Sequence, residues 1–232
     1  RFGREPTKID LFAGSFQLNR TNLPLLLDED EFTAEYVNDF EAGIRYISKD
    51  FNINTNLFYM DFENEIAPIG ELIAFGVQKR RNIPQSVRTG IEVEINYDNN
   101  FYYTNISGTY MHSNIEHINI EDTTYENITP VLSPEWIINA IVGVRPIEGL
   151  DMNLQGRYVS ESYLDLTNTF TMPGYFVFNY NIMYTYNNYS LALEFRNITD
   201  TEYFTFGAPS GDEPGFYPNA GFNLFGTLTL RF

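Results

Sequence analysis

Hydrophobic and polar residues alternate along most of the chain, and this period of two predicts an all-β protein. The clearest stretch runs from Val87 to Tyr97, where apolar residues and Thr occupy one face and charged residues, Gly and Asn occupy the other. Helical periodicity is almost absent. We expect nine strands, at 40–46, 51–59, 87–97, 102–110, 136–145, 150–158, 176–185, 189–196 and 222–232.

The connections between these strands alternate between short and long. The short ones, at 49–50, 98–100, 146–149 and 187–188, are rich in Asn, Asp, Gly and Pro, which favour tight turns. The long ones cover 61–86, 113–135, 159–173 and 197–221. Outer-membrane barrels have short periplasmic turns and long extracellular loops. The pattern therefore favours an antiparallel transmembrane β-barrel.

The placement of charge supports the same interpretation. All charged residues of the nine strands fall on the face opposite the apolar one: Glu41, Arg45, Arg88, Glu92, Glu94, Arg145, Asp151, Arg157, Glu194, Arg196 and Arg231. A charge that faces lipid near the middle of a membrane costs about 2–4 kcal/mol, so we expect the apolar face to contact lipid. The alternative is a soluble β-sandwich that binds carbohydrate through surface aromatics, because sandwich strands also alternate.

Composition narrows the range of partners. Asp and Glu number 31 against 14 Lys and Arg, giving a net charge of −17, which argues against nucleic acid as a partner. The predicted strands sum to +1, whereas residues 1–39 and the long connections sum to −16. We expect this acidic surface to meet lipopolysaccharide through divalent cations or to favour cationic ligands. The one basic cluster, Lys79, Arg80 and Arg81, is a candidate contact for phosphates.

Candidate chemistry is sparse. Aromatic residues in the Gly-rich last connection are the candidate contacts for a small-molecule ligand: Tyr203, Phe204, Phe206, Phe216 and Tyr217. His112 and His117 are weak candidates for a metal site, and because their spacing fits no strong signature we expect none. With no cysteine and only two histidines we expect no catalytic residue and no cofactor. A small outer-membrane barrel protease or lipase stays open as an alternative.

Several motifs resemble those of TonB-dependent outer-membrane receptors. Residues 222–232 end in Phe232 and are similar to the terminal strand of outer-membrane proteins. Residues 197–203 fit the pattern Asn-hydrophobic-x-Asp-x-x-Tyr that leaves the penultimate strand of these receptors. Asn82 with residues 86–94, and Arg4-Glu5-Pro6 followed by Leu11-Phe12, resemble earlier motifs of the family, in the family's order.

The resemblance implies a larger protein. The family barrel has about 22 strands and an N-terminal plug, so the nine strands here would be its C-terminal part. Residues 1–39 would be a segment of an extracellular loop, and residues 40–232 the C-terminal part of the barrel. The resemblance implies uptake of a scarce ligand, most simply a ferric siderophore, with TonB acting through the plug. The expected partners are the N-terminal barrel and plug of the same receptor, outer-membrane lipid and lipopolysaccharide.

Overall fold

The computed structural model describes residues 1–7, 10, 32–73, 77–120 and 123–232. Its strands are β1 (Phe2–Arg4), β2 (Glu35–Ile47), β3 (Phe51–Ile73), β4 (Val77–Asp98), β5 (Tyr102–Ile120), β6 (Thr123–Ile128), β7 (Trp136–Ile147), β8 (Leu150–Val159), β9 (Ser162–Tyr163), β10 (Thr171–Met172), β11 (Tyr175–Tyr186), β12 (Tyr189–Arg196), β13 (Phe204–Ser210), β14 (Glu213–Pro218) and β15 (Asn223–Leu230). Within the described ranges, no helix has the length and apolar character needed to cross a membrane.

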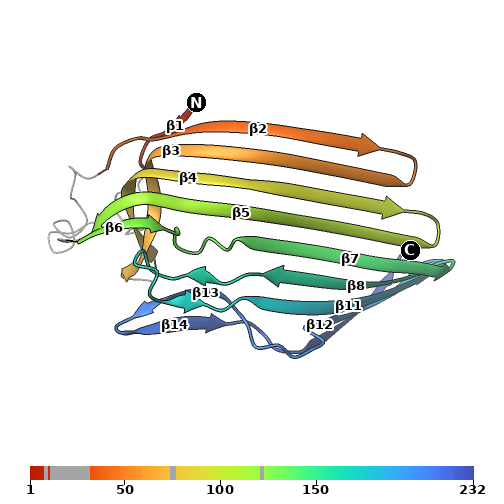
Figure 1. Cartoon of the computed structure of the whole chain (residues 1–232). Coiled ribbons are helices and arrows are strands. Elements are labelled where there is room, and N and C mark those ends of the chain that lie inside the picture. The colour runs from red at the N-terminus through yellow and green to blue at the C-terminus, as the bar shows by residue number, and fades with distance from the viewer. Residues whose placement is uncertain (8–9, 11–31, 74–76, 121–122) are drawn as a thin grey trace.

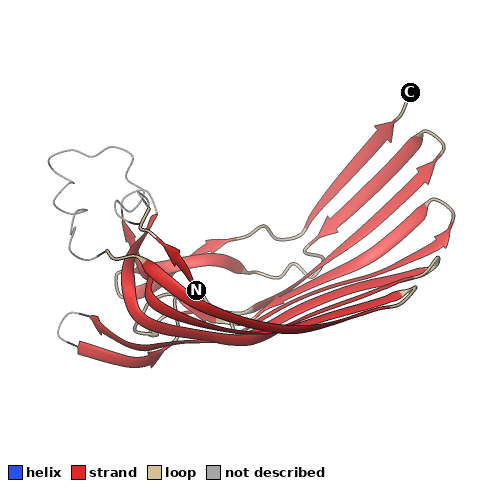
Figure 2. Cartoon of the chain, turned by 90° about the horizontal axis from the view of Figure 1, so that it is seen from above, coloured by secondary structure: helices blue, strands red, loops and turns tan. Residues whose placement is uncertain are grey.

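The main sheet has eleven antiparallel strands in the order β1-β2-β3-β4-β5-β7-β8-β11-β12-β15, with β6 paired to β5. Long strands that follow one another along the chain lie side by side across the sheet (Figure 1). Seen from above, the sheet is a curved, open wall whose first and last strands lie far apart (Figure 2). The small sheets β9–β10 and β13–β14 lie in the connections that precede β11 and β15.

The nine predicted strands are confirmed as β2, β3, β4, β5, β7, β8, β11, β12 and β15. The short turns are also where the sequence predicts them. The amide of Asn99 donates to the carbonyl of Tyr102 at 2.9 Å, which closes the turn between β4 and β5. In the next two turns Gly149 (φ 80°) and Asn187 (φ 50°) take the left-handed conformation that Gly and Asn tolerate best.

Two of the predicted long connections are mostly strand. Residues 61–86 continue β3 and β4, which stay paired out to Ile73 and Val77, and β5 continues to Ile120 before β6 returns along it. Similarly, β2 begins at Glu35, within the segment that was expected to be loop. Along the extended part of β3 the alternation of hydrophobic and polar residues is interrupted, because the backbone of Asn64 has φ 56° and the pairing register with β4 shifts between Pro68 and Leu72.

An apolar cluster packs beneath these strand extensions. It comprises Ala67, Ile83, Ile115, Ile118, Ile128, Val131 and Leu166. Ile83 and Ile115 are both 0 % exposed, although they lie outside the predicted strands. The cluster joins β3, β4, β5 and β6 to the connection after β9, and it forms a small hydrophobic core at the end of the wall that carries the long connections.

Candidate functional site

The two faces of the wall differ in chemistry, as the alternation predicts. One transverse row of cross-strand partners contains Leu154, Tyr180, Phe195 and Leu224. At the neighbouring positions of these strands, Gln155 pairs with Asn179 and Arg196 pairs with Asn223. Because neighbouring residues of a strand point to opposite faces, the wall has one apolar face and one polar face. We call the polar one the inner face.

Charges on the inner face are paired close to the tight turns. Arg145 contacts Asp98 (Nη1 to Oδ1, 2.7 Å) and Asp151 (Nε to Oδ2, 3.3 Å). The guanidinium carbon of Arg145 also lies 4.3 Å from the ring centroid of Tyr103, whose hydroxyl donates to Asp151 Oδ1 at 2.6 Å. These contacts connect β4, β5, β7 and β8, so the charged groups stiffen the wall.

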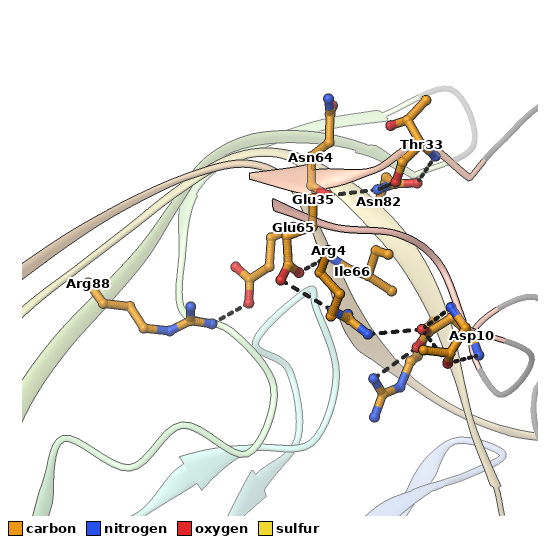
Figure 3. A network of polar contacts seen from close by, with 11 residues as sticks. Arg4, Asp10, Thr33, Glu35, Asn64, Glu65, Ile66, Asn82 and Arg88 are labelled. Carbon is orange, nitrogen blue, oxygen red and sulfur yellow. Dashed lines mark hydrogen bonds and ion pairs between the residues drawn. The ribbon is translucent and has the colours of Figure 1, made fainter. Parts of the chain in front are cut away.

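At the opposite end, a buried carboxylate holds the N-terminal segment (Figure 3). The side chain of Asp10 is 1 % exposed and accepts hydrogen bonds from Thr7 N (2.8 Å) and Thr7 Oγ1 (2.7 Å). It also pairs with Arg4 Nη1 at 3.0 Å and with Arg80 Nη1 at 3.1 Å. Burial by itself would raise the pKa of Asp10, but the bonds from Thr7 and the two arginine charges together lower it below its usual value.

Two further side chains, Glu35 and Asn82, also attach the N-terminal segment to β3 and β4. Glu35 lies between Arg4, whose Nε is 3.4 Å from Oε1, and the amide of Ile66, which donates to Oε2 at 2.7 Å. Asn82 accepts from Thr33 N at 2.8 Å and donates to Thr33 O at 3.0 Å. We call the set Arg4, Asp10, Glu35, Arg80 and Asn82 the polar anchor, because it fastens Arg4, Thr7, Asp10 and residues 33–35 to β3 and β4 (Figure 3).

A second buried carboxylate lies next to the polar anchor. Glu65 is 6 % exposed and accepts hydrogen bonds from Ser86 and Arg88, one on each oxygen. The guanidinium of Arg88 also lies over the ring of Phe62, 4.5 Å from its centroid. Arg88 therefore belongs to the charged face, as predicted, and is paired where β3 and β4 begin to extend beyond the predicted strands.

The five candidate aromatic residues lie on or beside the β13–β14 hairpin. Phe204 stacks on Phe216 with ring centroids 4.7 Å apart, and Phe206 contacts Tyr217 at 5.3 Å. The register shifts between Phe204 and Phe206, so these two pairs lie on opposite faces of the hairpin. Tyr203 stacks on Tyr175 at the start of β11, with centroids 4.9 Å apart.

One face of this hairpin is packed and the other is more open. A Cβ built on Gly207 would lie 3.2 Å from Leu164 Cδ2 and 3.2 Å from Phe216, so the face with Phe204 and Phe216 packs on Leu164. Leu164 itself is fully buried. On the other face, Tyr217 is 54 % exposed. Of these four rings Tyr217 is therefore the exposed one, and its cross-strand partner Phe206 is half-buried, as are Phe204 and Phe216.

The two histidines do not come together. They lie five positions apart on β5, so they point to opposite faces. His112 Nδ1 is 3.3 Å from Glu135 Oε1, whereas His117 is the cross-strand partner of Glu126. Within the described ranges, no three His, Cys, Asp or Glu residues are grouped as metal ligands.

The basic cluster is divided between two environments. Arg80 forms an ion pair with Asp10. Lys79 and Arg81 instead line a cavity of about 340 Å³, which Asp165 also lines. The cluster lies near the start of β4.

Sequence reasoning missed the polar anchor and Glu65, because their partners are far apart along the chain; Asp10 and Arg80 are separated by 70 positions. A local signal was available for the asparagine-based loop closures. Asn168 and Asn197 both have positive φ, and their amides bond to backbone groups of their own and neighbouring connections. Asn is the non-glycine residue best suited to such positions.

Comparison with known proteins identifies the family. A sequence model described as "TonB dependent receptor-like, beta-barrel" matches residues 4–198. The chain belongs to this family. It is accordingly part of a receptor barrel of the bacterial outer membrane, its apolar face is the lipid-facing one, and the soluble sandwich is excluded.

Individual relatives agree with the family. The ferrichrome outer membrane transporter/phage receptor of Escherichia coli K12 is 24% identical over 226 residues, which cover 88% of this chain and 28% of that protein. Among solved structures, the unliganded ferric citrate transporter FecA superposes with a TM-score of 0.69 at 23% identity, covering 86% of this chain and 32% of that one. The copper transporter OprC gives a TM-score of 0.72 at 15% identity, and the match covers 99% of this chain and 36% of that one. The chain thus spans about a third of the length of these proteins.

Proposed function

We propose that this chain forms the C-terminal part of the barrel wall of a TonB-dependent receptor that takes up a scarce ligand, most simply a ferric siderophore. The rest of the barrel, of about 22 strands in total, and the plug come from the N-terminal portion of the same receptor. TonB acts on the plug, and residues 1–39 belong to an extracellular loop. Catalysis has no part in this proposal.

The proposal rests on the two open edges of the main sheet, at β2 and at β15. In the described sheet, β15 pairs only with β12, and β1 covers only residues 35–37 of β2. Each unpaired backbone group in the hydrocarbon region costs several kcal/mol, so these edges need further strands. The inner face needs a polar partner for the same physical reason, because its Asn, Gln and charged side chains are unsuited to lipid.

For the ligand, the hairpin geometry favours Phe206 and Tyr217 over the packed pair Phe204 and Phe216, with Tyr203 beside Tyr175. Large rings on an accessible loop face supply contact area at a small cost in side-chain entropy. The acidic residues of the long connections would meet lipopolysaccharide through divalent cations.

The test uses the full-length receptor in cells that lack other siderophore receptors. Ferrichrome, ferric citrate and ferric yersiniabactin carrying radiolabelled iron would be supplied with and without TonB. We expect uptake of at least one complex that requires both TonB and the plug. Uptake that does not depend on TonB, or no uptake and no binding of any complex, would contradict the proposal.

A matched pair of variants tests the ligand contacts. Phe206→Ala with Tyr217→Ala should weaken binding of the transported complex by about tenfold, or about 1.4 kcal/mol, because two aromatic contacts are lost. Tyr186→Ala is the control, since this tyrosine is 63 % exposed but lies at a tight turn at the other end of the wall. Equal affinity of the two variants would remove the hairpin from the binding site.

A further inference from the structure

A cavity of about 740 Å³ lies where β8 ends and β11 begins, on the side of the long connections. Two of its aromatic rings, Tyr158 and Phe176, are cross-strand partners on the lipid-facing side of the wall, with centroids 6.2 Å apart. Other lining residues come from the connections before β7 and after β8. The cavity therefore lies at the rim of the wall, where the strands leave the membrane.

The lining has an unusual mixture of groups. Among the described residues it contains four aromatic rings, five serine and threonine residues and the two carboxylates of Glu135 and Glu161, but no Lys or Arg. A phosphate or carboxylate ligand would find no cation there and would meet two acidic groups. Hydroxyls and carboxylates instead suit a neutral ligand with many hydroxyl groups, and aromatic rings suit its apolar faces.

Backbone contacts fix the walls of this cavity. The amide of Ser160 donates to the carbonyl of Trp136 at 2.9 Å, and the amide of Trp136 donates to Ser160 Oγ at 3.1 Å. Tyr175 is held by its pairing with Val159 and by the ring of Tyr203. A site with fixed walls loses little entropy when it binds a ligand.

One hydroxyl in the lining lacks a partner. Ser162 is 3 % exposed, and its Oγ has no hydrogen-bond partner within the part of the chain that the structure describes. A buried hydroxyl without a partner costs free energy, which a bound group with hydrogen-bonding capacity would recover.

We propose that this cavity binds a neutral saccharide at the membrane surface. The tyrosine and phenylalanine rings contact the apolar faces of sugar rings, and the carboxylates of Glu135 and Glu161 accept hydrogen bonds from sugar hydroxyls. The lining includes neither Phe206 nor Tyr217, although its Tyr175 stacks on Tyr203 beside the hairpin, and the proposal does not depend on which ligand is transported. Its sugar comes either from a free oligosaccharide or from the headgroup of a membrane glycolipid.

The experiment uses the full-length receptor in a detergent without a sugar headgroup. Neutral trisaccharides of glucose, galactose, mannose and N-acetylglucosamine are titrated first in free form and then as alkyl glycosides, with binding measured by saturation-transfer NMR. We expect binding of at least one sugar. Tighter binding of the alkyl glycoside than of the free sugar assigns the site to a glycolipid, and equal binding assigns it to free oligosaccharide. No binding of any sugar in either form would overturn the proposal.

Variants locate the binding. Tyr163→Ala should weaken the affinity for the sugar by about tenfold, and Tyr163→Phe, which keeps the ring, should weaken it much less. Glu161→Gln should also weaken it, because a charge-assisted acceptor is lost. Tyr186→Ala is the control for an exposed tyrosine elsewhere. If sugar binding is unchanged in Tyr163→Ala and in Glu161→Gln while both variants fold, the cavity is not the site. Uptake of the iron complex should be normal in both, so the outcome is independent of the proposed transport.

Discussion

Replacing Gly143 with alanine should destabilise the wall, because the ring of Tyr103 occupies the space that the new methyl group would need. An alanine Cβ there would lie 2.2 Å from Tyr103 Cζ, 2.4 Å from its Cε1 and 2.5 Å from its hydroxyl oxygen. The two residues are direct cross-strand partners in β7 and β5. The ring would therefore have to leave its position above the glycine.

The magnitude follows from the contacts that the displaced ring would lose. The Tyr103 hydroxyl donates to Asp151 Oδ1 at 2.6 Å, and the guanidinium carbon of Arg145 lies 4.3 Å from the centroid of the ring. A hydrogen bond to a charged group is worth about 1.5–3 kcal/mol, and an exposed cation–π contact about 0.5–1 kcal/mol. Removing a glycine from a strand returns about 0.5–1 kcal/mol. We expect the free energy of unfolding to fall by about 2–3 kcal/mol.

The assay is urea unfolding of the full-length receptor in detergent, followed by tryptophan fluorescence, with a check that the urea dependence is unchanged. Gly108→Ala on β5 is the control, because the nearest atoms to its Cβ would be 3.8 and 4.0 Å away, and it should change stability by no more than about 0.5 kcal/mol. The three atoms nearest to the new Cβ all belong to Tyr103, so adding Gly143→Ala to Tyr103→Ala should cost nothing further. The reasoning would be refuted if the costs of Gly143→Ala and Tyr103→Ala added in the double variant. It would also be refuted if Gly143→Ala and Gly108→Ala were equally stable.

Two further variants test the connections. Asp10→Asn should destabilise the attachment of Arg4 and Thr7 by about 2 kcal/mol, which should appear as roughly 30-fold faster hydrogen exchange of the Thr7 amide at neutral pH. Because the folded pKa of Asp10 is lowered, the wild-type anchor should hold above about pH 4 and be lost as the pH falls through that pKa, whereas the variant should show no such acid step. Asn197→Ala should destabilise the receptor by about 2–3 kcal/mol, since the buried amide bonds to backbone groups of Thr201 and Ala220. Asn197→Gly should cost about 1 kcal/mol less because φ is 50° there, and equal costs in urea unfolding would show that backbone strain plays no part.

The wall could be predicted from the sequence because its determinants are local. A strand with one lipid-facing side shows period-two alternation, and antiparallel strands joined by tight turns fix the register of their neighbours. Leu154 and Gln155 therefore fall on the expected faces, and so do Tyr180 and Asn179 opposite them on β11. The alternation ends where the requirement to face lipid ends.

The extensions and the polar anchor could not be predicted in this way. Ile83 and Ile115 are buried by the small core and not by lipid, so their spacing follows the packing of several strands and connections. The sequence makes Arg80 a candidate contact for phosphates, whereas its partner in the structure is Asp10, which lies in a distant segment of the chain. The family motif marked Arg4 as notable, but its role follows from the distances to Asp10 and Glu35.

These pairings change what the net charge of −17 implies for a ligand. Near the tight turns Arg145 is paired with the carboxylates of Asp98 and Asp151, and at the other end Arg80 is paired with Asp10, so neither arginine contributes an unpaired positive charge. By sequence, residues 1–39 and the long connections carry an excess of acidic residues, and Glu135 and Glu161 belong to it. The field of such an excess repels anions at long range and attracts cations, an effect that salt screens over about 8–10 Å. An anionic ferric complex would therefore depend on short-range contacts such as the hairpin rings, whereas neutral sugars and neutral or cationic complexes would approach without an electrostatic barrier.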